Sequence, residues 1–120
     1  MVLDKIADFF KMDIQATRFN FYRDSNEWKP FHFDKNVDGQ NLTVAVSFGM
    51  ERLASFEHAE SKTRISFSQP NGTIYTFGKD VNIKWRHGIP AVYPDNYSEQ
   101  GRISIIAWGW VDQTYEYQGM

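Results

Sequence analysis

Short stretches in which polar and apolar residues alternate, separated by turn-forming residues, fill most of this 120-residue chain. The clearest stretch covers residues 42–48, where Leu42, Val44, Val46 and Phe48 are expected on one face of a strand. Seven further stretches are read as strands: 18–23, 30–34, 52–56, 63–68, 73–77, 81–85 (leading into His87) and 101–108. Alternation in many short segments is typical of antiparallel sheets, so the pattern predicts a mainly β protein.

About eight such strands fit a double-stranded β-helix, or jelly roll. Residues 2–12 read as a short amphipathic helix, which we expect to pack on the outside of a sheet; a partner-binding helix is the alternative. Residues 69–72, Gln-Pro-Asn-Gly, form the strongest turn signal and should join the flanking strands in a hairpin. No repeat or linker divides residues 1–120, so one domain is expected.

Composition limits the function classes. The chain has no Cys, which excludes disulfide-linked partners and thiolate metal sites. Its net charge is −2, and its thirteen Lys and Arg form no cluster of four or more, which argues against a large nucleic-acid footprint. Residues 1–12 lack the apolar run of a signal peptide, and no stretch approaches a membrane span. A soluble, cytoplasmic protein without membrane association is therefore expected.

The segment Pro30-Phe31-His32-Phe33-Asp34 holds an imidazole and a carboxylate two residues apart. On a strand, His32 and Asp34 would project to the same side. With His87 they would form a 2-His-1-carboxylate facial triad, which leaves coordination positions open on non-haem Fe(II). The alternative is that His32 pairs with a surface acid and that His87 is a loop residue. The sequence around these residues leaves both interpretations open.

Further polar residues fall on the strand faces that are expected to point inward. Asn20 and Tyr22 share one face of their strand, as do Arg102, Ser104 and Trp108 on another. Burying polar groups is costly unless a ligand or partner satisfies them. These residues therefore predict a binding site in the interior, together with the triad.

The order of these residues along the chain is also recognisable. It runs Asn20-x-Tyr22, Pro-Phe-His32-x-Asp34, Ser47-Phe48-Gly49, Gly72-x-Ile-Tyr-x-Phe-Gly78, His87-Gly-Ile and Arg102-x-Ser104. This order and spacing resemble the AlkB family of Fe(II)- and 2-oxoglutarate-dependent dioxygenases, which fold as double-stranded β-helices. The resemblance extends from about Asn20 to Trp108, which is most of the chain.

The resemblance implies roles for individual residues. His32, Asp34 and His87 match the iron ligands, and Arg102 matches the arginine that grips the distal carboxylate of 2-oxoglutarate through a bidentate pair. Asn20 and Tyr22 match residues that hydrogen-bond this co-substrate, and Ser104 stands at the polar position of the family's Arg-x-Asn or Arg-x-Ser motif. Asn36 stands where some members contact the substrate base, although an ordinary turn-forming Asn is the alternative.

Two departures from the family pattern stand out. The position of a second arginine, six residues after Arg102, is occupied by Trp108. Co-substrate binding is therefore expected to depend on Arg102 alone, with Trp108 as an apolar wall of the substrate site. Only nineteen residues precede Asn20, so the lid that grips a flipped nucleotide is expected to be reduced or absent.

The implied reaction uses 2-oxoglutarate and O₂ to hydroxylate a C–H bond, which on an N-methyl group leads to demethylation. The expected substrates are alkylated nucleobases in single-stranded DNA or RNA. The acidic pI and the short segment before Asn20 favour an alternative, hydroxylation of a protein side chain or a small metabolite. A jelly-roll binding module with a vestigial site is a third, non-enzymatic possibility, against which the complete triad and Arg102 argue.

Overall fold

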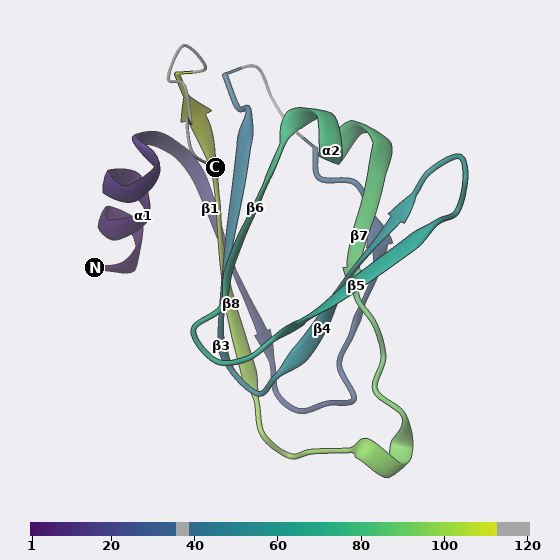
Figure 1. Cartoon of the computed structure of the whole chain (residues 1–120). Coiled ribbons are helices and arrows are strands. Elements are labelled where there is room, and N and C mark those ends of the chain that lie inside the picture. Colours follow the sequence, from purple (N-terminus) through teal and green to yellow (C-terminus); the bar gives the residue numbers. More distant parts are fainter. Residues whose placement is uncertain (36–38, 113–120) are drawn as a thin grey trace.

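The computed structural model describes residues 1–35 and 39–112 and is mainly β. Two four-stranded antiparallel sheets face each other (Figure 1). The first has the order β1 (Met12–Tyr22), β8 (Arg102–Val111), β3 (Leu42–Gly49) and β6 (Ile74–Gly78). The second has the order β2 (Lys29–His32), β7 (Trp85–Ile89), β4 (Arg52–His58) and β5 (Arg64–Gln69). Over the described ranges, no helix combines the length and the apolar character needed to cross a membrane.

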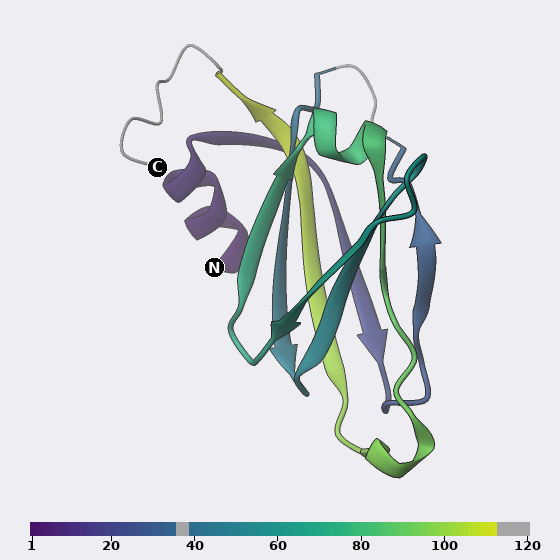
Figure 2. The ribbon, with the colours of Figure 1, turned by 45° about the vertical axis from the view of Figure 1, so that its right-hand side comes forward.

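The N-terminal helix α1 (Val2–Phe10) covers the outer face of the first sheet (Figure 2). It ends at Lys11, whose left-handed backbone (φ 52°) turns the chain into β1. The buried Ile6 packs in one core cluster with Val44 and Val46 of β3 and Ala107 of β8. The expectation that this helix packs on the outside of a sheet is therefore confirmed.

The central strand β3 is buried on both faces. Leu42, Val44, Val46 and Phe48, the apolar face predicted from the sequence, belong to the core beneath α1. The alternate residues Thr43, Ala45 and Ser47 are also buried, although two of them are polar. The strand therefore separates an apolar layer under the helix from a more polar interior between the two sheets.

The predicted strand over residues 81–85 is wrong, because a short helix, α2 (Lys79–Lys84), precedes β7. The alternating Val81 and Ile83 suggested a strand, but both side chains are exposed. Asn82 between them is buried, and it bonds to the backbone of Asp34. The helix thus buries Asn82 against a distant partner, a contact that the local pattern does not show.

The predicted hairpin around residues 69–72 is also wrong. The turn exists, with Gly72 in the left-handed region (φ 86°), but β5 pairs with β4 while β6 pairs with β3. The turn is tied to the end of β3, because the Gly72 N–H donates to the Ser47 carbonyl and Gly49 donates to the Asn71 side chain. It therefore carries the chain from the second sheet to the first. A 3₁₀ turn (Pro94–Asn96) lies in the loop that returns the chain to β8.

Candidate metal centre

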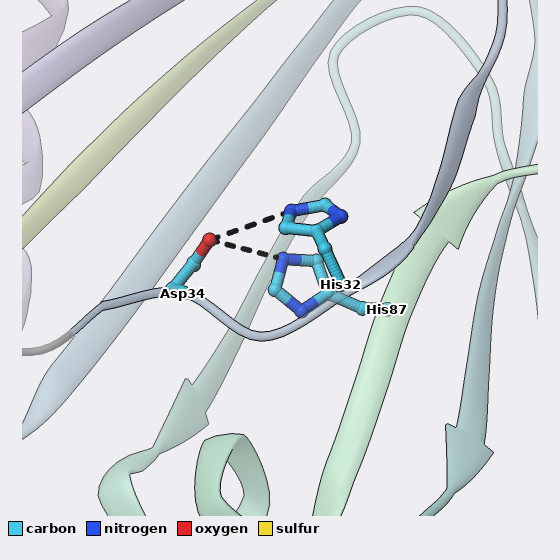
Figure 3. Close-up of side chains that lie close together, drawn as sticks. All are labelled: His32, Asp34 and His87. Carbon is cyan, nitrogen blue, oxygen red and sulfur yellow. Dashed lines mark ion pairs between the residues drawn. The ribbon is translucent and has the colours of Figure 1, made fainter.

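His32, Asp34 and His87 converge between the two sheets (Figure 3). His32 at the end of β2 pairs directly with His87 on β7, and their ring centroids are 4.3 Å apart. Asp34 lies two residues beyond the end of β2 rather than within a strand. Its Oδ1 is nevertheless 3.5 Å from Nε2 of each histidine, and the three possible ligand atoms lie within 4.8 Å of one another.

The two imidazoles are oriented in different ways. Nδ1 of His32 lies 2.9 Å from the Pro30 carbonyl, which can only accept, so Nδ1 donates to it and Nε2 is directed towards Oδ1 of Asp34. The His87 ring is held by packing, with the rings of Phe56 and Phe77 at centroid distances of 5.8 and 5.1 Å. Its buried Nδ1 has no hydrogen-bond partner among the described residues.

The position of Asp34 is fixed by two elements outside the triad. Asn82 of α2 accepts from the Asp34 N–H at 3.0 Å and donates to the Asp34 carbonyl at 2.8 Å. The Trp108 indole N–H donates to Oδ2 at 3.1 Å, which leaves Oδ1 facing the histidines. Burial alone would raise the pKa of Asp34, but bonds to His32 and His87 outweigh it and hold the pKa well below its usual range.

A small, partly open cavity beside the triad is lined by the residues that the sequence assigned to co-substrate binding. Direct cross-strand pairs between β1 and β8 place Asn20 opposite Ser104 and Tyr22 opposite Arg102. The Asn20 amide donates to the Ser104 hydroxyl at 3.3 Å. All four line the cavity together with His32, Asp34 and His87, so the structure brings the predicted metal ligands and the predicted co-substrate residues into one place.

Arg102 is buried in the wall of this cavity. Its Nε donates to the Ser47 hydroxyl at 2.8 Å and its Nη2 to Oε1 of Gln69 at 3.2 Å, while Nη1 has no partner among the described residues. Burial lowers the pKa of this guanidinium, and Tyr22 and Tyr75 partly offset the effect. The charge is held in the interior by neutral groups, which leaves it able to bind an anion.

Two further predicted residues fall elsewhere. Trp108 lines a surface groove beside the triad rather than the cavity, and its bond to Asp34 makes it more than the apolar wall that was expected. Asn36 lies outside the described residues, so its predicted contact with substrate stays a prediction.

Sequence reasoning missed several residues of the site. Lys29 and Tyr75 line the cavity, and burial raises the pKa of Tyr75 to about 12. Asn82, Ser47 and Gln69 hold Asp34 or Arg102 in place. Tyr75 could have been found from its place between Gly72 and Gly78 in the motif that carries the resemblance. Asn82 and Gln69 carry no local signal, because only the fold brings them to their partners.

A scan against protein-family models finds no match for this chain, and a search of curated proteins finds no similar sequence. The chemical interpretation therefore depends on the site itself. Two imidazole nitrogens and one carboxylate oxygen converge without a thiolate, a donor set that divalent transition metals accept and that leaves coordination positions open. The bond from His32 to Pro30 and those from Asn82 and Trp108 to Asp34 are of the kind that orient metal ligands.

Proposed function

We propose that this protein is an Fe(II)- and 2-oxoglutarate-dependent dioxygenase of the AlkB type that hydroxylates, and thereby demethylates, alkylated nucleobases. The observation that carries the proposal is that the His32–Asp34–His87 triad and the buried Arg102 line one cavity. Among the described residues, no carboxylate forms an ion pair with Arg102. A surface His–Asp pair would need neither a cavity lined by residues of both sheets nor a buried cation in its wall.

The arrangement of the strands supports a jelly roll as the underlying fold. Jelly rolls consist of eight strands in two facing sheets, between which the chain crosses repeatedly. Here the orders β1-β8-β3-β6 and β2-β7-β4-β5 interleave strands distant in sequence, and successive strands change sheet at nearly every connection. The candidate site lies between the sheets, as the proposal requires.

The residues of the chain would divide the work as follows. His32, His87 and Oδ1 of Asp34 would hold the metal, and the bond from Trp108 to Oδ2 would restrict Asp34 to one coordinating oxygen. Arg102 would bind the distal carboxylate of 2-oxoglutarate, with Asn20, Tyr22 and Ser104 along the cavity wall. Iron held in this way supplies, with 2-oxoglutarate and O₂, the oxidation that yields succinate, CO₂ and a hydroxylated substrate carbon.

The lining of a groove beside the triad favours a substrate that carries both negative charge and a nucleobase. Three cationic side chains line it, Arg18, Lys29 and Lys35, although the chain as a whole carries a net charge of −2. Its lining also includes the rings of Phe33 and Trp108, and aromatic faces can stack nucleobases. A single-stranded nucleic acid could place its phosphates beside these cationic side chains and stack a base on these rings.

The test measures metal uptake and turnover separately. Wild-type protein should take up one Fe(II) or Mn(II) anaerobically, and His87→Ala should abolish tight uptake because it removes one of three ligands. With Fe(II), O₂ and 2-oxoglutarate, N-methylated single-stranded oligonucleotides should release formaldehyde faster than duplexes, since extruding a base from a duplex costs a few kcal/mol.

Three results would count against the proposal. Wild-type protein without metal uptake, or uptake unchanged in His87→Ala, would refute the metal centre. Faster turnover of duplex would contradict the preference for single strands. Succinate formation with a peptide or a small metabolite, but with no oligonucleotide, would favour the alternative hydroxylase.

A further inference from the structure

A second arginine lies deep in the same end of the interior as Arg102. Arg52, the first residue of β4, is 3 % exposed, as is Arg102 on β8. Its Cζ lies 5.8 Å from the centroid of the Tyr22 ring, and that of Arg102 lies 5.1 Å from the same centroid. Gln69 links the two residues, because it accepts from the Arg102 guanidinium and donates to the Arg52 carbonyl.

No carboxylate among the described residues pairs with either guanidinium. Arg52 donates from Nη2 to the carbonyls of Glu27 and Pro90 at 2.9 and 3.1 Å, and its buried Nε and Nη1 find no partner in the described part of the chain. The two charges also act on each other, and burial together with Arg102 lowers the pKa of Arg52. Burying one unpaired charge is expensive, and burying two close together is more so.

We propose that Arg52 is the second cation of an anion subsite centred on Tyr22, where it strengthens binding of the distal carboxylate of a 2-oxo dicarboxylic acid. Arg52 does not line the cavity, so it acts as a positioning residue, through Tyr22 and through its charge, while Arg102 makes the direct contact. The inference rests on the proposed function for the identity of the ligand.

The proposal accounts for the Trp at position 108. The sequence pattern left Arg102 as the only expected cation for the co-substrate, because Trp108 stands where the resemblance calls for a second arginine. The fold provides another arginine from β4, a strand of the opposite sheet. Trp108 is thereby free for its bond to Asp34.

The experiment compares two ligands that differ by the distal carboxylate. Isothermal titration calorimetry of the full chain, with and without Mn(II), measures the affinities for 2-oxoglutarate and 2-oxobutyrate. Arg52→Met should weaken 2-oxoglutarate about tenfold, because a full charge acts across a poorly solvated interior, and should leave 2-oxobutyrate unchanged. Arg52→Lys, which keeps the charge, should restore part of the affinity.

Arg64→Met is the matched control. It removes the same charge from the second sheet, where Arg64 pairs with Glu57 and is largely exposed, so both affinities should stay at the wild-type values. Equal 2-oxoglutarate affinity in Arg52→Met and wild type, or equal weakening of both ligands, would overturn the proposal. If Arg52→Met does not fold, Arg52→Lys should weaken 2-oxoglutarate by less than about tenfold and leave 2-oxobutyrate unchanged. Wild-type affinity for 2-oxoglutarate in Arg52→Lys, or an equal loss for both ligands, would then overturn the proposal.

The titrations with and without Mn(II) distinguish a failure of this inference from a failure of the proposed function. Absence of Mn(II) uptake would refute the metal centre, while metal-free binding of 2-oxoglutarate that depends on Arg52 would still support the subsite. No binding of 2-oxoglutarate to wild-type protein in either arm would overturn the subsite.

Discussion

Replacing Asn82 with Ala should weaken metal binding at the proposed centre without changing a residue of the triad. The amide of Asn82 makes two hydrogen bonds, one to the N–H and one to the carbonyl of Asp34. Asn82→Ala removes both bonds and leaves the two backbone groups of Asp34 without these partners. No ligand atom is changed, so an effect on metal binding must come from the position of Asp34.

The size of the effect follows from those two bonds. Each hydrogen bond contributes about 1 kcal/mol net, so the free energy of unfolding should fall by about 2 kcal/mol. Loss of groups that orient metal ligands typically weakens metal binding about 10- to 100-fold. We therefore expect a metal affinity reduced within that range, measured by anaerobic Mn(II) titration, together with a lower urea midpoint.

Asn41 offers a matched control within the same chain. It is as buried as Asn82, and its amide makes the same pair of bonds to the N–H and carbonyl of Val111, at 2.8 and 2.9 Å. Asn41→Ala should therefore cost a similar amount of stability but leave metal affinity unchanged. Equal metal affinity in Asn82→Ala and Asn41→Ala would refute the argument that α2 positions Asp34.

Three further predictions test other parts of the structure. Arg102→Lys should weaken 2-oxoglutarate binding by on the order of 2–5 kcal/mol in calorimetry, because an ammonium cannot reproduce the guanidinium fork, while metal uptake stays unchanged. The bond from Arg64 lowers the pKa of Glu57, so its stabilisation is present above the unfolded pKa of about 4.3 and is lost as pH falls; in urea titrations, Glu57→Gln should flatten the loss of stability below that pH. Gly109→Ala should lower the free energy of unfolding by about 1–3 kcal/mol or more, since the added Cβ would lie 2.0 Å from the Asp13 carbonyl oxygen. The midpoint of urea unfolding should fall accordingly.

The parts of the site that the sequence could predict are those that strand alternation determines. Asn20 and Tyr22, like Arg102 and Ser104, are two residues apart, so a strand had to place each pair on one face. The interior location of these four residues follows from that rule once the strands are assigned. Asp34 reaches His32 even though it lies beyond β2, because α2 and Trp108 hold it there.

The parts that could not be predicted depend on distant contacts. Residues 81–85 have a strand-like alternation, but residues 79–84 form a helix whose buried Asn82 bonds to the distant Asp34, a contact that the local pattern does not show. Residues 69–72 are strongly turn-forming, but turn-forming residues determine only that the chain reverses direction. They do not determine which strands pair on either side of the turn. Arg52 looks like any other arginine in the sequence, since nothing nearby marks it as buried.

The pairing of β1 with β8 has a consequence for how the protein is made. Met12 lies opposite Val111 and Tyr22 opposite Arg102, so β1 cannot form its pairing with β8 until β8 has been synthesised. The candidate metal ligands are also far apart in sequence, since His32 and Asp34 are synthesised well before His87. Long-range pairing of this kind folds slowly, typically in milliseconds to seconds. A metal bound at the proposed centre would therefore be captured only after His87 has been made, and we expect β1 to be exposed to aggregation until β8 has been synthesised.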